Sequence, residues 1–236
     1  MSRQAWVLDI ETIPEGLEPG EQIVVPQRYR VPYTPPRYTR TPTATEAARA
    51  QDDHDQKCLD LYLRTALHPR RCQVVAWAAI PLQGGLIEHY VGPDEGLLLN
   101  SLEDWLAGCR RDVRILAWNG PGFDFPVLRA RALVHDRPKL AGVFAPRAWQ
   151  GRVFGSSDTL VDLMPFAPEA SRGYASKKDV AASWGVDIST HDGSEVATLW
   201  SHDRLDAIRD HVVEDVEVER RLAEIFRVGE ILGVEW

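Results

Sequence analysis

Cysteine is scarce in this chain of 236 residues, which contains three, Cys58, Cys72 and Cys109. Their number is odd and none forms a CxxC pair, which speaks against a disulfide framework or a structural zinc site. We therefore expect the protein in the reducing cytoplasm. Long hydrophobic runs are also missing: no segment approaches the roughly 18 apolar residues of a membrane span. The N-terminus lacks the basic and apolar regions of a signal peptide.

Positive charge is in short supply as well. The chain has 27 Lys and Arg against 35 Asp and Glu, a formal net charge of -8. This excess of acid speaks against a protein that coats nucleic acid by charge alone. It does not exclude one that works through bound metal, because a carboxylate cluster adds negative charge that the ions offset locally.

The hydrophobic pattern predicts strands first and then strands alternating with helices. Strands are expected at 5–11, 73–80, 86–91 and 113–118, with a short apolar piece at 158–163, and helices at 44–66, 95–108, 123–134, 177–184 and 204–227. This order is typical of one α/β domain with a central mixed sheet flanked by helices. We expect a single domain over 1–236, with residues 14–68, rich in Pro, Arg and Tyr, inserted on it.

The first strand carries two acids. Alternation along a strand places Val7, Asp9 and Glu11 on one face, with the two carboxylates roughly 6.5–7 Å apart. That separation suits two divalent ions about 3.5–4 Å apart with one carboxylate bridging them. The alternative is that both acids lie at an exposed strand end and only begin a turn.

Two further acids stand in distinctive surroundings. Asp124 follows a Gly-Pro-Gly loop and begins a predicted helix, whose N-terminus favours its ionised form. His211 and Asp215 are four residues apart and therefore share one face of a helix, at its buried seam. Each has an ordinary alternative: Asp124 as a helix-terminal acid, and His211 as a half-buried histidine with a local partner. Asp162, on the short apolar piece, is interpreted as structural.

Taken together, these motifs resemble the three exonuclease motifs of the DEDD superfamily of 3'→5' exonucleases. Asp9-Ile-Glu11-Thr12 resembles the first, Asn119-Gly-Pro-Gly-Phe123-Asp124 the second, and His211-x-x-x-Asp215 the third. The resemblance looks closest to the predicted exonucleases related to the proofreading domain of family B DNA polymerases. It implies an RNase H-like fold and release of nucleoside 5'-monophosphates from a single-stranded 3' end.

The resemblance also implies residue roles. Asp9, Glu11, Asp124 and Asp215 would hold two divalent metal ions, Mg²⁺ or Mn²⁺, and Thr12, Asn119 and Phe123 would contact the terminal nucleotide. The third motif departs from the superfamily pattern. Its spacing is that of the form with Tyr, yet His211 stands there, and the position five before Asp215 is Asp210. His211 is therefore expected to act as a substituted general base that positions the attacking water.

A basic loop over 26–43 is the candidate for binding nucleic acid. It contains no acids, and it has four arginines: Arg28, Arg30, Arg37 and Arg40. The arginines could bind phosphates, and the tyrosines of the loop could stack on unpaired bases. Alternatively it is a proline-stiffened loop whose arginines pair with the protein's own acids. Lys177 and Lys178 form a second, weaker basic spot.

The expected partner is a single-stranded nucleic acid, DNA rather than RNA, with no membrane involved. Two other functions stay open at this point. One is a non-catalytic single-strand-binding module that keeps the same fold, which the departure at His211 favours. The other is an RNase H-like endonuclease, which would release internal fragments instead of mononucleotides.

Overall fold

A computed structural model describes residues 4–34, 36, 41–109, 113–145, 159–188 and 193–234. Its centre is a five-stranded sheet in the order β3-β2-β1-β4-β5. The strands are β1 (Ala5–Pro14), β2 (Cys72–Pro81), β3 (Glu88–Val91), β4 (Arg114–Ala117) and β5 (Leu160–Asp162). The pairs β1–β2 and β2–β3 are antiparallel, whereas β1–β4 and β4–β5 are parallel, so the expected mixed sheet is confirmed.

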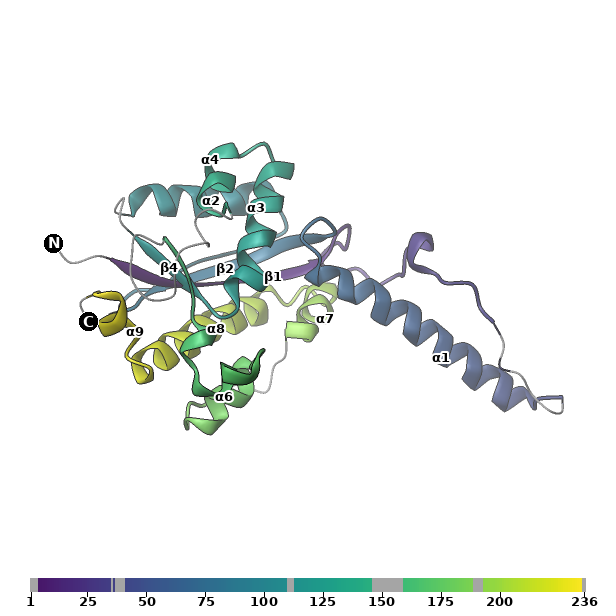
Figure 1. The fold of residues 1–236 in the computed structure, drawn as a ribbon. Coiled ribbons are helices and arrows are strands. Elements are labelled where there is room, and N and C mark those ends of the chain that lie inside the picture. Colours follow the sequence, from purple (N-terminus) through teal and green to yellow (C-terminus); the bar gives the residue numbers. More distant parts are fainter. Residues whose placement is uncertain are drawn as a thin grey trace.

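Helices cover both faces of this sheet (Figure 1). One face is covered by α2 (Glu95–Gly108), α3 (Asp124–Val134) and α4 (Pro138–Val143). The other carries α6 (Lys177–Ser183), α7 (Val196–Ser201), α8 (Leu205–Ile225) and α9 (Val228–Leu232). The expectation of a sheet flanked by helices is therefore confirmed as well.

Strand β1 divides its side chains between these two layers as alternation predicts. Leu8 and Ile10 pack in the core beneath α2 and α3, whereas Val7 packs in the core beneath α8. Because Asp9 and Glu11 alternate in step with Val7, they face the α8 layer. The β1–β2 register shifts between Glu11 and Thr12, a bulge that follows directly on the second acid.

The long helix α1 (Ala44–Leu63) stands out from the sheet and its two layers (Figure 1). The N-cap of this helix is Thr43. Its side chain accepts a hydrogen bond from the Glu46 N–H, and the Glu46 carboxylate accepts the Thr43 N–H at 2.8 Å. This reciprocal pair satisfies two free helix donors at once, which explains the choice of Thr43.

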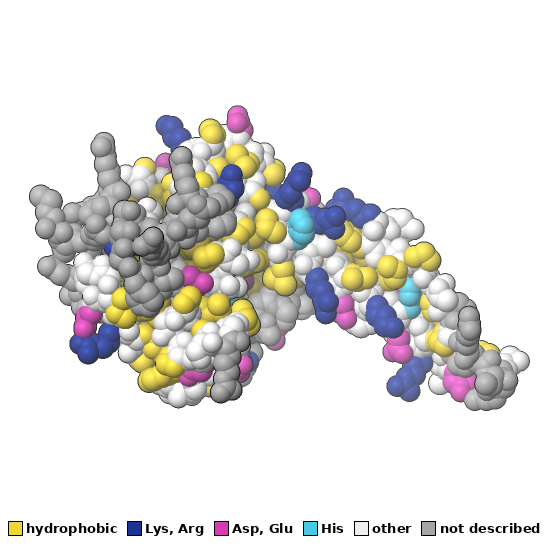
Figure 2. All heavy atoms as spheres, viewed as in Figure 1, with side chains coloured by type: hydrophobic (Ala, Val, Ile, Leu, Met, Phe, Trp, Pro, Cys, Tyr) yellow, Lys and Arg dark blue, Asp and Glu magenta, His cyan; other side chains and the backbone are white. Residues whose placement is uncertain are grey.

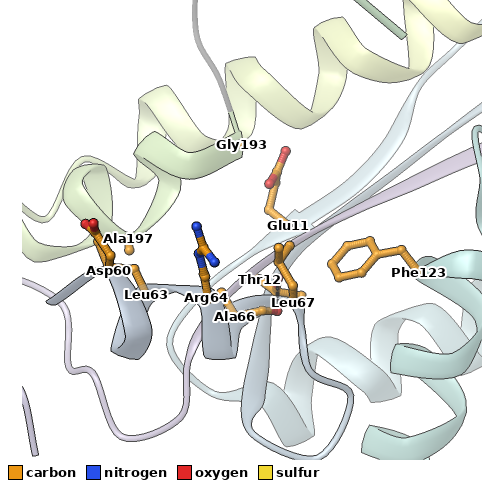
Figure 3. Close-up of a pocket in the computed structure, with 10 residues that line it drawn as sticks. All are labelled: Glu11, Thr12, Asp60, Leu63, Arg64, Ala66, Leu67, Phe123, Gly193 and Ala197. Carbon is orange, nitrogen blue, oxygen red and sulfur yellow. Dashed lines mark hydrogen bonds between the residues drawn. The ribbon is translucent and has the colours of Figure 1, made fainter. Parts of the chain in front are cut away.

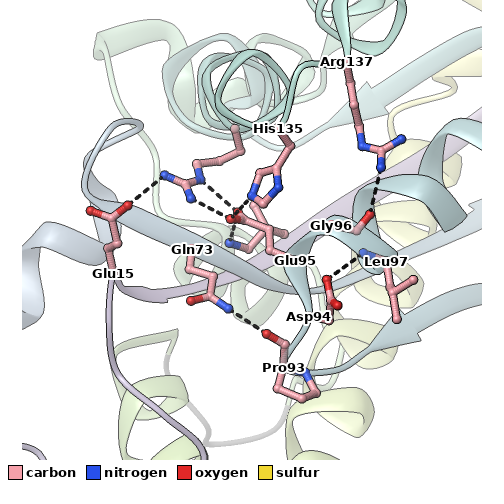
Figure 4. A network of polar contacts seen from close by, with 11 residues as sticks. Glu15, Gln73, Pro93, Asp94, Glu95, Gly96, Leu97, His135 and Arg137 are labelled. Atoms are coloured by element: carbon pink, nitrogen blue, oxygen red, sulfur yellow. Dashed lines mark hydrogen bonds and ion pairs between the residues drawn. The ribbon is translucent and has the colours of Figure 1, made fainter.

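A buried ion network fixes α2 and α3 to β2 (Figure 4). The Glu95 carboxylate accepts hydrogen bonds from the Val74 N–H at 2.8 Å and from the Arg131 guanidinium at 2.9 and 2.6 Å, and lies 2.8 Å from His135 Nε2. Both Glu95 and Arg131 are buried. Because α3 begins with Asp124, this network also holds that acid in position.

Charged side chains of both signs are exposed on the projecting arm, residues 14–68. Lys and Arg side chains are visible along the face of this arm shown in Figure 2. Among the described residues of the arm, Arg28, Arg30, Arg49, Lys57 and Arg64 are exposed, and so are acids of α1, Asp52, Asp53, Asp55 and Asp60. As for membranes, none of the helices in the described ranges combines the length and the apolar character needed to cross a bilayer.

Candidate active site

Acids from three separate elements meet on the α8 side of β1. Asp9 and Glu11 come from β1, Asp124 begins α3, and Asp215 lies in the middle of α8. Two cationic or ionisable side chains connect them. The Lys177 ammonium lies 3.8 Å from Asp9 and 2.9 Å from Asp215. His211 Nδ1 lies 3.4 Å from Glu11 and 3.7 Å from Asp215.

These carboxylates are largely removed from water. Asp9, Glu11 and Asp124 are 8, 7 and 2% exposed. Burial, together with the negative charge of Asp215, raises the pKa of Asp9 to about 6, although Lys177 opposes the shift. Burial and then the charge of Asp9 raise the pKa of Glu11 and of Asp124 well above their usual range. The cluster therefore lacks positive charge.

Lys177 is the positive group that the structure places in this cluster. Interpreting it as part of a surface basic spot with Lys178 was wrong, because its side chain is only 18% exposed and contacts Asp9, Asp215 and Glu219. An ammonium group beside buried carboxylates offsets part of their charge, which explains why this lysine turns inward. Lys178, its neighbour on α6, is exposed as expected.

Glu219 belongs to the same cluster and was not anticipated. It is fully buried; one oxygen accepts the Lys177 ammonium at 2.9 Å and the other accepts the Trp118 N–H at 3.1 Å. Burial raises the pKa of Glu219 to about 8, against the opposing charge of Lys177. The available signal was its spacing, four residues after Asp215 and thus on the same face of α8.

The loop before α3 is held by a carboxylate on β5. Asp162 Oδ1 accepts the N–H groups of Asn119 at 2.9 Å and Met164 at 3.0 Å. Asn119 adopts a left-handed backbone conformation with φ 55°. A side chain on Gly120 would come within 2.9 Å of Ala117 Cβ and overlap the fully buried Phe125 ring. Asp162 thus has the structural role expected for it, since it sets the path of the loop into Asp124.

A cavity of about 480 Å³ adjoins the cluster at Glu11 (Figure 3). Thr12 and Phe123, both expected to contact substrate, line it. The opposite wall is the end of α1 with the 3₁₀ turn that follows it, and sequence reasoning did not find this wall: Leu63, Arg64, Ala66 and Leu67. Thr12 ties the two sides together, because its hydroxyl donates to the Ala66 carbonyl at 2.8 Å.

The other expected substrate contacts lie elsewhere. Asn119 does not line this cavity; its amide packs over Gly122. Arg28 lies over the Tyr29 ring, whose centroid is 5.3 Å from that of Tyr62 on α1, and Arg30 donates to the Val25 carbonyl at 3.2 Å. Both belong to the projecting arm, apart from the carboxylates (Figure 1). Arg37 and Arg40 fall outside the described residues.

Comparisons with known proteins agree with this architecture. Residues 94–218 match the family model described as "Predicted 3'-5' exonuclease related to the exonuclease domain of PolB". The structure resembles a family B DNA polymerase from the hyperthermophilic archaeon Pyrobaculum calidifontis, with TM-score 0.57 and 18% identity. The match covers 96% of this chain but 25% of that polymerase, and it supports the RNase H-like fold. A comparison with curated proteins found no match.

Proposed function

Because the chain belongs to the family of predicted 3'-5' exonucleases related to the exonuclease domain of PolB, we propose that it is a metal-dependent exonuclease that shortens single-stranded DNA from the 3' end. One observation carries the proposal. The carboxylates of Asp9, Glu11, Asp124, Asp215 and Glu219 gather around one ammonium group, that of Lys177, among the described residues. Five acids facing one cation leave a strong demand for further positive charge.

The residues fit divalent metal ions. Carboxylate oxygens are the ligands that Mg²⁺ and Mn²⁺ prefer, and burial, followed by the charges of neighbouring carboxylates, raises the pKa values of Asp9, Glu11 and Asp124. Asp9, Glu11, Asp124 and Asp215 are the residues that would hold two ions. Such a pair supplies an activated hydroxide and stabilises the leaving 3' oxygen when bound.

The protein's own side chains complete the proposed centre. Lys177 places a permanent positive charge between Asp215 and Glu219, and Glu219 anchors that lysine to the backbone at Trp118. His211, buried between Glu11 and Asp215, stands where the resemblance expects the group that positions the attacking water.

The cavity beside Glu11 is the proposed site of the terminal nucleotide. Its volume falls within the ~300–1,000 Å³ of small-ligand pockets. Phe123, Leu63 and Leu67 offer apolar surface for a base, and the Arg64 side chain reaches into the same space for a phosphate (Figure 3). The projecting arm extends outward from this cavity, and we propose that its arginines Arg28, Arg30, Arg37 and Arg40 contact the rest of the strand.

We treat residues 1–236 as one exonuclease-like domain, with residues 14–68 inserted as its substrate arm. The rigid base of this arm supports the assignment: Thr12 on β1 bonds to Ala66, and Tyr29 packs on Tyr62. The three cysteines are free, which suits the reducing cytoplasm as the place of activity.

The direct test follows a single-stranded DNA labelled at its 5' end in one reaction and at its 3' end in another, with Mg²⁺ or Mn²⁺. The wild type is expected to release a labelled mononucleotide from the 3' end and to leave a descending ladder from the 5' label. Asp9→Ala and Asp215→Ala are each expected to be slower by at least about 10²–10³-fold, the usual cost of losing one transition-state-stabilising group.

Asp210→Ala is the matched control. Asp210 lies on α8, one turn before Glu214, with a 69% exposed side chain that pairs with Arg209, so full activity is expected. Equal rates for the wild type, Asp9→Ala and Asp215→Ala would refute the site. Binding of single strands without cleavage in any metal would instead identify the non-catalytic module, and internal fragments would identify an endonuclease.

A further inference from the structure

His211 is unusual among the buried polar residues of this protein. It lies on α8 one turn before Asp215 and is 5% exposed. Both of its ring nitrogens are buried, and neither has a hydrogen-bond partner within the described ranges. A buried imidazole normally satisfies at least one nitrogen with a neighbouring donor or acceptor, because leaving both unsatisfied is costly. The side chain is therefore arranged for a partner that the polypeptide does not provide.

Its position relative to two carboxylates indicates what that partner is. Nδ1 lies 3.4 Å from Glu11 Oε1 and 3.7 Å from Asp215 Oδ2, and one ligand atom from each of the three residues lies within 4.8 Å of the others. Two ligands that each lie about 2.1 Å from a shared octahedral ion are about 3.0 Å apart when adjacent and about 4.2 Å apart when opposite. The two measured separations fall between these values and are longer than the ~2.7–3.2 Å of a direct hydrogen bond.

We propose that His211 Nδ1, together with the carboxylates of Glu11 and Asp215, directly binds one divalent ion, and that this imidazole makes the site select Mn²⁺ over Mg²⁺. The role assigned to this residue changes accordingly: it acts on the attacking water through the ion that it holds. The inference rests on the proposed metal-dependent function and specifies which ion that function uses.

The selectivity follows from ligand chemistry. Mg²⁺ demands oxygen ligands and gives up its water reluctantly, whereas first-row transition-metal ions bind imidazole nitrogen, Mn²⁺ more weakly than Fe²⁺, Ni²⁺ or Zn²⁺. A set of two carboxylates and one imidazole is therefore poorer for Mg²⁺ than four carboxylates are. Mn²⁺ accepts both oxygen and nitrogen donors, so the substitution of nitrogen for oxygen in this set changes the preferred ion while the fold stays the same.

Lys177 and His211 approach the same oxygen of Asp215. The Lys177 ammonium lies 2.9 Å from Asp215 Oδ2 and 2.9 Å from Glu219, and His211 Nδ1 lies 3.7 Å from the same Oδ2. His211 Nδ1 also lies 3.4 Å from Glu11, which lines the cavity. A cation bound by His211, Glu11 and Asp215 would therefore lie next to that cavity.

The test detects histidine nitrogen at bound Mn²⁺ by electron spin-echo envelope modulation, on the full-length protein with one equivalent of Mn²⁺ and no nucleic acid. The wild type is expected to show ¹⁴N modulation, and a sample with ¹⁵N-labelled histidine is expected to show the ¹⁵N frequencies instead. His211→Gln is expected to lose the modulation and to bind Mn²⁺ at least tenfold more weakly, since even residues that only support a metal ligand cost about 10–100-fold.

Two further variants complete the design. His89→Gln removes an exposed histidine of β3 and is expected to keep both modulation and affinity. His211→Tyr introduces the tyrosine that the superfamily pattern has at this position. This variant is expected to lose the ¹⁴N modulation and to show a smaller ratio of Mn²⁺ affinity to Mg²⁺ affinity in competition titrations. If neither His211 variant folds, the labelled wild type decides alone, because among the described residues His211 is the histidine in the group of three side chains that could hold a metal ion.

Each contrary outcome has a separate meaning. Mn²⁺ bound without nitrogen modulation in the wild type, or modulation that survives in His211→Gln, overturns the ligand role and leaves the exonuclease proposal intact. Equal wild-type affinity for Mg²⁺ and Mn²⁺ overturns the selectivity. A wild type that binds no Mn²⁺ overturns the inference and the metal dependence together, and the strand-shortening assay then decides the exonuclease proposal independently.

Discussion

The Lys177 ammonium lies 2.9 Å from a carboxylate oxygen of Asp215 and equally far from one of Glu219. Glu219 in turn accepts the Trp118 N–H at the end of β4. This chain of contacts joins α6, α8 and the sheet through two ion pairs of Lys177 and one hydrogen bond from the backbone. The lysine that offsets the charge of the proposed metal-binding cluster is thus also a structural tie between layers.

Lys177→Met is expected to destabilise the protein. It leaves fully buried Glu219 without its charge partner, and breaking a buried pair in this way costs about 3–5 kcal/mol. For a chain of this size that lowers Tm by about 6–20 °C. Calorimetry of the metal-free protein at about pH 9, above the raised pKa of Glu219 of about 8, measures the change. Lys178→Met removes an exposed lysine of the same helix turn, and the free energy of unfolding is expected to change by less than about 0.5 kcal/mol. Similar Tm values for both variants would refute a structural role for the Lys177 contacts.

Stability of the metal-free protein is expected to fall as pH rises from about 4 to 8. The pKa of Asp9 is about 6 and that of Glu219 about 8, both above their ordinary values of 3.8 and 4.5. The folded state therefore holds these two protons more tightly than the unfolded state does. Proton binding contributes its full stabilisation of the folded state below the ordinary pKa values, and this contribution is lost as the pH rises through the raised pKa values. Thermal melts with a chelator measure the slope. Asp9→Asn is expected to flatten it between pH 4 and 6, and an unchanged slope in that variant would contradict the assignment.

Adding metal is expected to reverse this trend. Ions bind the deprotonated carboxylates, so their stabilising effect grows with pH. At 100 times its Kd, Mn²⁺ bound only by the folded state contributes about 2.7 kcal/mol, which raises Tm by about 5–10 °C. Melts at pH 5 and pH 8 with and without Mn²⁺ check the sign. A larger Tm increase at pH 5 than at pH 8 would show that the ion binds elsewhere.

Gly120→Ala is expected to lower exonuclease activity by about 10²-fold. The added methyl group would meet Ala117 and the Phe125 ring, both fully buried, so the loop must shift, and with it Asp124 at the start of α3. A displacement of about 1 Å costs about that much in rate. Gly142→Ala is the control, because its methyl group meets nothing within 4 Å. Rates of strand shortening and Tm are measured for both, and an active Gly120→Ala would show that the loop position is unimportant.

Arg64→Ala is expected to raise the KM for single-stranded DNA about tenfold at constant kcat. Its guanidinium reaches the cavity from the C-terminal end of α1. Loss of one phosphate contact weakens DNA binding and lowers the slope of the logarithm of the binding constant against the logarithm of the salt concentration by about one. Arg49→Ala, on the same helix but outside the cavity lining, is the control. KM values at several salt concentrations separate the two, and identical KM values would remove Arg64 from the substrate site.

The parts of this structure that the sequence predicted are those with a strong local pattern. Alternation along β1 predicts that Asp9 and Glu11 share a face with Val7, and helical spacing predicts the bounds of α2 and the extent of α8 to within two residues. These features depend on neighbours in the chain. The short helices α4, α7 and α9 were not predicted, because five or six residues carry too little periodicity to separate them from loops.

The charged interior could not be predicted from such patterns. Lys177 stands beside Lys178 in sequence, and only the packing of α6 on α8 brings it to Asp215 and Glu219. Glu219 lies among several acids of α8 with nothing local to mark it as buried. The cavity wall at Arg64 depends on the Thr12 to Ala66 hydrogen bond, which joins segments 54 residues apart. In each case the position of the residue is set by a long-range contact.

The hydrogen bond between Thr12 and Ala66 also fixes the base of the arm, so the C-terminal end of α1 lies at the cavity and the helix extends away from it. Its 20 residues span about 30 Å, about the length of nine stacked nucleotides at 3.4 Å each. We expect a bound strand to extend along this length: oligonucleotides shorter than about nine nucleotides should be degraded with rising efficiency per added nucleotide, and longer ones at a constant efficiency. A kcat/KM independent of length from three nucleotides upward would show that the strand does not follow α1.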